Sequence, residues 1–368
     1  MLPRLARAAI DRTSKWRPNS KSNLVVEWRY LAGRIIDGAQ DYGVIVALTD
    51  VKFPTPAQEL LVERQDLIGG TAPVSKAYTG SLTYDNGSAT YTFQANQGQA
   101  SATWQLDAAS QVYHLSVATP ELSLPNVVLR PRGDLIPEGG DGVIGVGQVL
   151  GFQIGSDYYA DWASIEIGGQ PRGVARIDMQ GLYPLLQGAA AGHLRDGPAQ
   201  ASTDYDHHWF AVAGQAGGQP VYVSAWRIEA ASGPFWDVTI ARISGAGWTV
   251  ASTTEQSTAI QPLAVRELTW QPLPPSAGLG AMQAGAAWRI TAGVRQPGDL
   301  IDLEIAVPPG QFASSARFGA LGGLSWMEEA VGKQASGTVQ GQPLSGVTLA
   351  VAESTAEFSV GYLPLVRR

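Results

Sequence analysis

The chain has 368 residues, of which only 15% are charged, and a formal charge of −7 at pH 7. This length accommodates two domains, each large enough to bury a core of its own. The acidic balance gives no electrostatic reason to bind nucleic acid, so small molecules or proteins are the expected partners. Cysteine is absent, which excludes disulfides and thiolate chemistry. The 43 glycines and 23 prolines favour short strands joined by tight turns, and so a mostly β protein.

Charged residues interrupt the apolar character of the N-terminal segment, residues 1–22. Arg4, Arg7, Asp11 and Arg12 break any continuous apolar core, so a secretion signal is not expected and a cytoplasmic location is. Apolar residues in this segment nevertheless recur at helical spacing, with basic residues between them. Such a basic amphipathic helix either docks on the body of the protein or makes peripheral contact with a membrane or with biosynthetic enzymes. No stretch reaches the roughly 18 to 20 apolar residues that span a bilayer.

From residue 23 onward the chain is organised in short segments. Thr55-Pro56 is a helix start signal, so AQELLVERQDL (57–67) predicts a helix of about three turns. SLTY and ATYTFQ flank Asn86-Gly87, which suits the positive φ angles of a type I′ hairpin. SATWQLD and QVYHLSV follow, and such consecutive strands build a meander that closes as an up-and-down barrel or a bent sandwich. A barrel of about eight strands would hold one small ligand.

A linker is predicted at residues 187–200, because QGAAAGHLRDGPAQ is small, polar and without periodicity. Residues 134–142 predict a loop, and the glycine-rich GVIGVGQVLG (142–151) predicts a strand or loop, since no βαβ pattern surrounds it. A second set of strands follows, in the segments VYVSAWRIEA, FWDVTIARI, AAWRITAGV, IDLEIAV, VTLAVAE and AEFSVGY. The expected fold is therefore all-β and mainly antiparallel, with few short helices and with domains at residues 23–200 and 201–368.

Titratable groups gather in STDYDHHWF, residues 202–210. A carboxylate such as Asp206 beside an imidazole can fix its tautomer and provide a donor or a proton-transfer group near neutral pH. His207 and His208 are adjacent and would point to opposite faces of a strand, which argues against a metal site. One histidine is expected to be functional and the other structural. A strand that only ties two domains together through hydrogen bonds is an equally weighted alternative.

Aromatic residues are the other candidates for a site. Trp28 and Tyr30 share one face of an expected first strand beside Glu27, and Trp326 lies two residues before Glu328 late in the chain. Tryptophan suits a pocket wall that is apolar but keeps an N–H donor. Packing in a core is the default explanation of such aromatic residues. The further candidates for pocket walls or donors are Tyr158, Tyr159, Trp209 and Trp226.

Several of these segments resemble the hydroxyneurosporene synthase and AttH-like family. Glu27-Trp28-Arg29-Tyr30-Leu31-Ala32-Gly33 and Tyr42-Gly43 resemble its opening segments, and Asp206-His207-His208-Trp209 is similar to its central Asp-His-Glu/Gln-Trp-Gly motif. Ser325-Trp326-Met327-Glu328-Glu329-Ala330-Val331 resembles its late Tyr-Trp-Glu-Gly-Ala-Val segment, and Gly361-Tyr362 its closing Gly-Tyr. The matches follow family order over nearly the whole chain. The resemblance implies two lipocalin-like β domains.

Some positions depart from the family's motifs. His208 replaces Glu or Gln, Phe210 replaces Gly after the central tryptophan, and Glu329 replaces Gly in the late segment. The Gly-Ser-Val-Phe-Ser-Pro-Tyr-Tyr opening of the carotenoid-hydratase branch is absent from the sequence. Length and layout resemble instead the branch of natural-product cyclases that catalyse Diels–Alder reactions on polyene chains. The resemblance therefore implies a cyclase for an apolar polyene or polyketide intermediate, of the kind used in antibiotic biosynthesis.

A cycloaddition needs no nucleophile, metal or redox cofactor, and the sequence lacks a Gly-Lys-Ser/Thr phosphate loop, a Gly-x-Ser-x-Gly elbow and a His-Glu-x-x-His pair. No cofactor is expected. In this interpretation Trp28, Tyr30, Trp209 and Trp326 line a cavity between the domains. His208 or His207, oriented by Asp206, is the polar anchor.

Two alternatives stay open at this point. One is a hydratase or isomerase that protonates an isoprenoid double bond, for which Asp206, Glu27 or Glu328 would need a pKa raised by burial. The other is a carrier that binds an apolar ligand and returns it unchanged.

Overall fold

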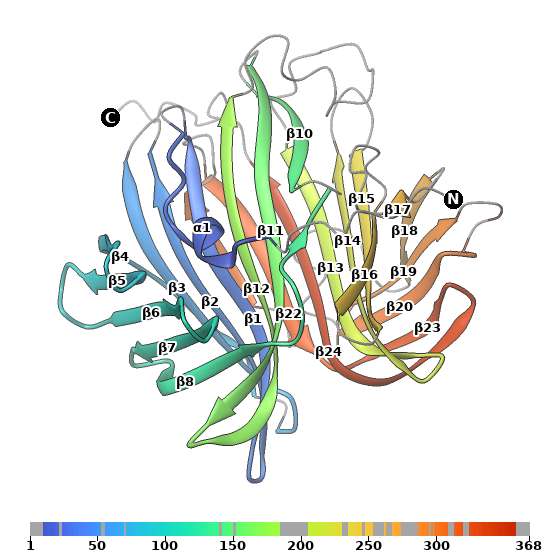
Figure 1. The fold of residues 1–368 in the computed structure, drawn as a ribbon, viewed down its shortest axis with the longest axis horizontal. Coiled ribbons are helices and arrows are strands. Elements are labelled where there is room, and N and C mark those ends of the chain that lie inside the picture. Colours follow the sequence, from blue (N-terminus) through green and yellow to red (C-terminus); the bar gives the residue numbers. More distant parts are fainter. Residues whose placement is uncertain are drawn as a thin grey trace, which may run out of the picture.

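The computed structural model is almost entirely antiparallel β-structure, as predicted (Figure 1). It describes residues 10–21, 24–52, 56–69, 71–139, 142–149, 152–184, 205–229, 235–244, 247–252, 261–262, 267–273, 286–293, 296, 298–307, 313–318 and 324–357. Within these ranges the helix is α1 (Arg12–Trp16), which is too short to cross a membrane. The predicted linker at 187–200 lies outside the described residues, so the domain boundary near residue 200 stays a prediction.

The first sheet contains twelve strands in the order β10-β11-β12-β1-β2-β3-β4-β5-β6-β7-β8, with β9 paired to β11. Pairing of β8 with β11 closes ten of them, β1–β8, β11 and β12, into a barrel. The strands are β1 (Val26–Asp37), β2 (Gln40–Val51), β3 (Ala57–Asp66), β4 (Val74–Asp85), β5 (Thr90–Ala95), β6 (Ser101–Asp107), β7 (Val112–Ala118), β8 (Ser123–Pro131), β9 (Ile136–Pro137), β10 (Val143–Val149), β11 (Phe152–Ile167) and β12 (Gln170–Pro184).

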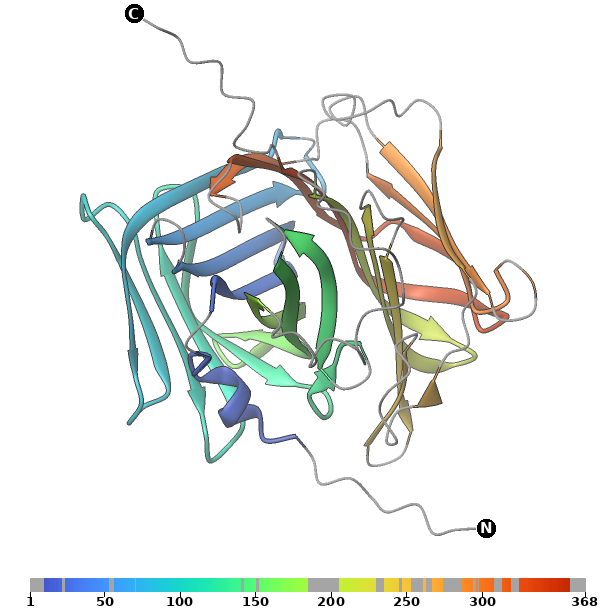
Figure 2. The same ribbon diagram turned by 90° about the horizontal axis from the view of Figure 1, so that it is seen from above.

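The second sheet also contains twelve strands and curls without closing, beside the ring of the first (Figure 2). Its order is β17-β16-β15-β14-β13-β24-β23-β20-β19-β18, and β22 pairs with β24 and β21. The strands are β13 (Tyr205–Ala216), β14 (Gln219–Glu229), β15 (Phe235–Ser244), β16 (Gly247–Ser252), β17 (Gln261–Pro262), β18 (Glu267–Leu273), β19 (Ala286–Gly293), β20 (Ile301–Val307), β21 (Ala313–Phe318), β22 (Leu324–Gly332), β23 (Ala335–Val339) and β24 (Gln342–Glu357).

Residues 57–66 form β3, so the predicted helix at 57–67 is wrong. Leu60 and Val62 face the interior of the barrel, whereas Leu61 between them packs toward the second sheet. Both faces of β3 are therefore buried, which makes its apolar residues contiguous instead of alternating. A contiguous apolar run flanked by Glu and Gln cannot be told from a buried helix by periodicity alone.

The predicted hairpin joins β4 to β5, but its turn is not type I′. Asp85 pairs with Thr90, and in the loop between them the positive φ angle belongs to Ala89, at 51°. The carboxylate of Asp85 accepts hydrogen bonds from the backbone N–H groups of Gly87 and Ser88. This side-chain closure of the turn replaces the left-handed Asn-Gly pair that the sequence suggested.

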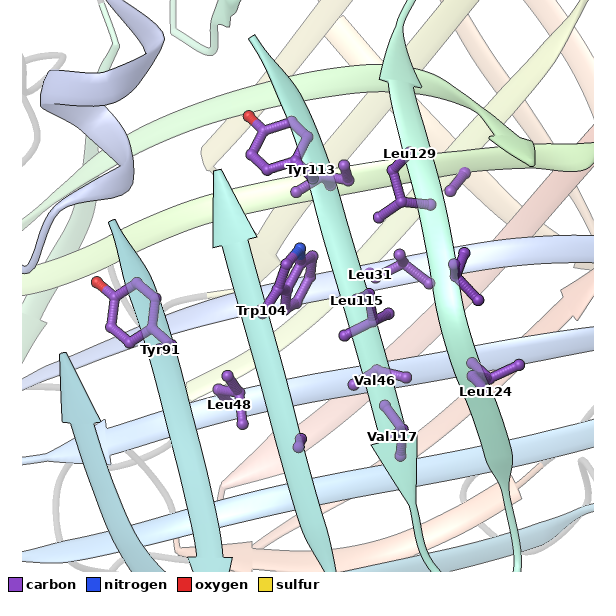
Figure 3. Close-up of a cluster of buried hydrophobic side chains, with 14 of the residues drawn as sticks. Leu31, Val46, Leu48, Tyr91, Trp104, Tyr113, Leu115, Val117, Leu124 and Leu129 are labelled. Atoms are coloured by element: carbon purple, nitrogen blue, oxygen red, sulfur yellow. The ribbon is translucent and has the colours of Figure 1, made fainter. Parts of the chain in front are cut away.

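The ring closes with ten strands instead of the expected eight, and side chains pack together in a core inside it. Figure 3 shows aromatic residues of β5–β7 and aliphatic residues of β1 and β2 converging on this core. Trp16 of α1 is fully buried and contacts Trp104, Tyr113 and Tyr91 edge-on. A wider barrel needs more side-chain volume, and α1 supplies part of it.

A buried ion pair fixes α1 in this position. The Arg12 guanidinium donates to both carboxylate oxygens of Asp161, at 2.5 and 2.9 Å, and the Tyr113 hydroxyl donates to the same carboxylate at 2.6 Å. Ile10 packs against the barrel core. The predicted amphipathic helix lies mostly in residues 1–9, outside the described residues, but the part of the N-terminal segment that is described docks on the body of the protein.

Candidate functional site

Three adjacent strands of the barrel present a grid of side chains toward the second sheet. Strand alternation turns the even-numbered residues of β1, β12 and β11 to this face, where they join one buried cluster with residues of the second sheet. The register places Tyr30 opposite Asp178, and Gln180 between Trp28 and Tyr158. The opening motif predicted from sequence therefore points Trp28 and Tyr30 at the second sheet.

The second sheet contributes a single row of five residues, one from each of five strands. Backbone pairing aligns Asp237 with Trp226, Trp226 with Trp209, Trp209 with Glu353, and Glu353 with Glu329. We call these five residues the acid–tryptophan row. Two central tryptophans are thus flanked by carboxylates on both sides, an arrangement that no local stretch of sequence displays.

Direct contacts join the grid to the row. The Tyr30 hydroxyl donates a 2.9 Å hydrogen bond to Oε1 of Glu329. The Tyr30 and Trp209 rings meet edge-on with centroids 6.1 Å apart, and the Tyr158 and Trp226 rings meet in the same way at 5.8 Å. We call the grid and the row together the interface layer. Edge-on aromatic pairs of this kind are favourable because the positive ring edge meets the negative ring face.

Gln65 of β3 holds the backbone at Glu329. Its side-chain amide donates to the Glu329 carbonyl at 3.2 Å and accepts from the Val331 N–H at 2.7 Å. Gly43 of β2 permits this close approach, because a Cβ at that position would lie 2.6 Å from Cβ of Val331. The Tyr42-Gly43 match of the sequence thus marks the place where β2 meets β22.

Arg176 is the buried cation of the interface layer, with 1% of its surface exposed. It donates to Asp178 at 2.8 Å, to Glu138 at 2.7 Å and to the Tyr158 hydroxyl at 3.1 Å. Its guanidinium carbon also lies 5.0 Å from the centroid of the Trp209 ring. The cation therefore links the carboxylates of the first sheet to the tryptophans of the second.

Burial and crowding of negative charge raise the pKa values of two carboxylates here. Burial raises the pKa of Glu138 to about 7, and the charge of Asp237 adds to this, against the opposing effect of Arg176. Burial raises the pKa of Asp178 to about 6, with Arg176 opposing and Glu353 adding. One guanidinium cannot neutralise several carboxylates, so protonation relieves the excess charge. The carboxyl group of Glu138, which binds Arg176 beside the interface layer, is therefore partly protonated near neutral pH.

The interface layer also contains a buried indole N–H group that is not engaged in a hydrogen bond with any described residue. The Trp209 indole N–H is buried and has no acceptor among the described residues. The hydroxyl of Tyr158 already donates to Asp178 at 3.0 Å, as that of Tyr30 does to Glu329. Trp209 is therefore an uncommitted buried donor of the interface layer.

The structure brings together only part of the predicted site. Tyr30, Tyr158, Trp209 and Trp226 are buried in the interface layer, and half-buried Trp28 lies at its edge. Glu27 and Tyr159 instead line a pocket on the opposite face of β1 and β11. Half-buried His208 lies on the face of β13 that carries Phe210, opposite to Trp209. The side chains of Asp206, His207, Trp326 and Glu328 lie outside the described residues, so their roles stay predictions.

The charged residues of the interface layer were missed from the sequence. The sequence pattern that indicates them lies in ARIDMQ, residues 175–180. There Arg176, Asp178 and Gln180 alternate with apolar residues inside a long strand. Polar side chains that recur at every second residue, on a strand buried on both faces, indicate a polar cluster. Across the described residues, no group of three His, Asp or Glu side chains could hold a metal ion.

Comparison with known proteins identifies structures of similar fold but no protein that is related in sequence. No protein-family model matches the chain, and no curated protein matches it in sequence. Kievitone hydratase from Nectria haematococca is similar in structure, with a TM-score of 0.55 at 12% identity over 90% of each chain. A putative AttH from Nitrosomonas europaea gives 0.52 at 13% identity, over 96% of this chain and 99% of that one. CghA gives 0.50 at 12% identity, over 96% and 94%. The likeness shows a common fold, in agreement with the fold that the sequence resemblance implied.

Proposed function

We propose that the chain is a cofactor-independent enzyme that acts on an extended apolar small molecule in the interface layer, and that it catalyses a Diels–Alder-type cyclisation in natural-product biosynthesis. The acid–tryptophan row facing Tyr30 and Arg176 is the observation that carries this proposal. It combines aromatic surface with a small number of fixed polar groups, which is the composition of a site for an apolar substrate. On this proposal the two sheets are the predicted lipocalin-like domains, residues 23–200 and 201–368, of a cytoplasmic protein.

The cyclisation requires that the substrate be held in a reactive conformation and that one polar group contact it. A conjugated diene and an alkene within one substrate form two new carbon–carbon σ bonds, three π bonds become one, and no atom is gained or lost. Trp209, Trp226 and Tyr30 would hold the chain folded in a reactive conformer and exclude water. The Trp209 N–H would donate to a carbonyl conjugated with the alkene, and so stabilise the charge that develops on that oxygen.

A second reaction is favoured by the proton that Glu138 holds near neutral pH. Glu138 would donate it to one carbon of a double bond, and water would add to the other carbon and return a proton to the carboxylate. Similarity in fold to an enzyme named kievitone hydratase supports this candidate.

The mass of the product separates these reactions. The test incubates the protein in D2O with a linear trienone whose conjugated diene and enone are joined by a short saturated chain. Cyclisation gives a product of the substrate's mass with no deuterium on carbon, whereas hydration adds water and places deuterium on carbon. Recovery of unchanged substrate, in spite of saturable binding, would make the protein a carrier and overturn the proposal of an enzyme.

Variants place the reaction in the interface layer. Trp209→Phe keeps an aromatic ring and removes the donor, so the rate should fall about a hundredfold, as for loss of one transition-state donor. Trp104→Phe is the matched control, because Trp104 is also a buried tryptophan but lies in the barrel core. Equal rates in both variants would remove the interface layer from the mechanism.

A further inference from the structure

We propose that a small dianion binds in a pocket at the mouth of the first barrel, formed by the N-terminal segment with β1, β11 and β12. The pocket has a volume of about 250 Å³. Its position follows from the alternation of β1, because Glu27 and Arg29 line this pocket whereas Trp28 and Tyr30 belong to the interface layer. The two faces of one sequence motif therefore contribute to two sites.

The charges that line the pocket do not balance. Lys21 is paired with Asp157 at 2.7 Å, and Glu27 lies 3.6 Å from Arg29. The cations that line the pocket outnumber the carboxylates by two. The cations are Lys15, Arg17, Lys21 and Arg29, and the carboxylates are Glu27 and Asp157. An excess of positive charge concentrated in a pocket of a protein whose net charge is −7 indicates an anionic ligand.

Lys15 and Arg17 provide the unmatched charges. The Lys15 ammonium lies 4.3 Å from the centroid of the Tyr159 ring, and among the described residues it has no carboxylate partner. Arg17 follows α1 and is exposed, and its positive charge opposes the rise that burial causes in the pKa of Tyr84. A ligand with two negative charges would neutralise this pair, which is why we infer a dianion.

Buried Arg29 orders the wall of the pocket. Only 4% of its surface is exposed, and its guanidinium donates to the carbonyl oxygens of Trp16, Arg17 and Trp28, at 2.7 to 3.2 Å. These carbonyl acceptors, together with the Glu27 carboxylate 3.6 Å away, hold the guanidinium in place. Arg29 also fixes the segment that carries Lys15 and Arg17, so the cations of the pocket are held in place before a ligand arrives.

The test measures binding of inorganic phosphate by isothermal titration calorimetry at low ionic strength. We expect saturable binding to the full-length protein that weakens as sodium chloride is added, because the attraction is electrostatic. Lys15→Gln and Arg17→Gln should each weaken binding about tenfold or more, since each removes one charged donor. Lys76→Gln, an exposed lysine on β4 outside the pocket, should leave binding unchanged.

Further arms define the ligand and protect the test against misfolding. Succinate in place of phosphate distinguishes a dicarboxylate from a phosphate, and binding of either supports a dianion. Lys15→Arg keeps the charge and should retain binding, so loss of binding in Lys15→Gln alone reports charge and not damage to the fold. Absence of binding of both anions to the unmodified protein, or equal binding by all variants, would overturn the proposal.

Discussion

Glu138→Gln tests the electrostatics of the interface layer. Glutamine mimics the protonated carboxyl group, so the variant removes the titration and keeps the shape of the side chain. Burial raises the pKa of Glu138 from 4.5 to about 7. The folded state therefore retains a proton that the unfolded chain has released, and this group's contribution to stability is present below pH 4.5 and is lost as the pH rises through 7.

The magnitude follows from the size of the shift. A rise of 2.5 pKa units is worth about 3 kcal/mol at 1.36 kcal/mol per unit, and integration between pH 5 and 8 gives about 2.5 kcal/mol. The unfolding free energy of the unmodified protein should therefore fall relative to that of Glu138→Gln by about this amount across the range.

Urea unfolding at several pH values between 5 and 8 measures this difference. Glu304→Gln is the control, because Glu304 is an exposed residue of β20, and its curve should run parallel to that of the unmodified protein. A difference between the protein and Glu138→Gln that stays constant with pH would refute the raised pKa. It would also remove the main support for proton transfer as the second candidate reaction.

Three further substitutions probe single contacts. Arg12→Met leaves the Asp161 carboxylate buried without its cation and should cost about 3 to 5 kcal/mol in chemical denaturation; a loss below about 1 kcal/mol would show that α1 is not anchored by this pair. Tyr30→Phe removes the donor to Glu329 and should lower the unfolding free energy by about 1 to 3 kcal/mol, whereas an unchanged melting temperature would argue against the contact. Trp209→Phe removes ring volume from a buried contact, so it should lower the unfolding free energy by about 1 to 3 kcal/mol, as Trp104→Phe should, but it alone should slow turnover; turnover that falls alike in both variants would assign Trp209 to packing alone.

The sequence predicted the kind of structure well because its signals are local. Alternation of apolar residues marks the strands, and glycine and proline mark the turns, so an all-β antiparallel fold follows without knowledge of the tertiary structure. The prediction of a helix at 57–67 was wrong because the burial of this segment depends on residues that are distant in the sequence. β3 is buried on both faces, and that depends on the second sheet, which lies far away in the sequence.

Only the aromatic residues of the candidate site could be predicted from the sequence. Trp28, Tyr30 and Trp209 stand in recognisable motifs, and strand alternation explains why they reach the interface layer. Glu329 and Glu353 enter it because two strands of the second sheet lie side by side in a particular register, which sequence alone does not reveal. Glu329 had been visible only as a departure from the family's late motif, at a position where the family has glycine.

Photoaffinity labelling most directly tests the claim that an apolar polyene binds in the interface layer. The protein is irradiated with a linear polyene carboxylate that carries a diazirine, and labelled residues are identified by tandem mass spectrometry. We expect labels on β1 and β13 at Trp28, Tyr30 or Trp209, and loss of labelling when unlabelled polyene competes. Labels confined to the barrel core at Trp104 and Tyr113, or no label that competes, would contradict the account.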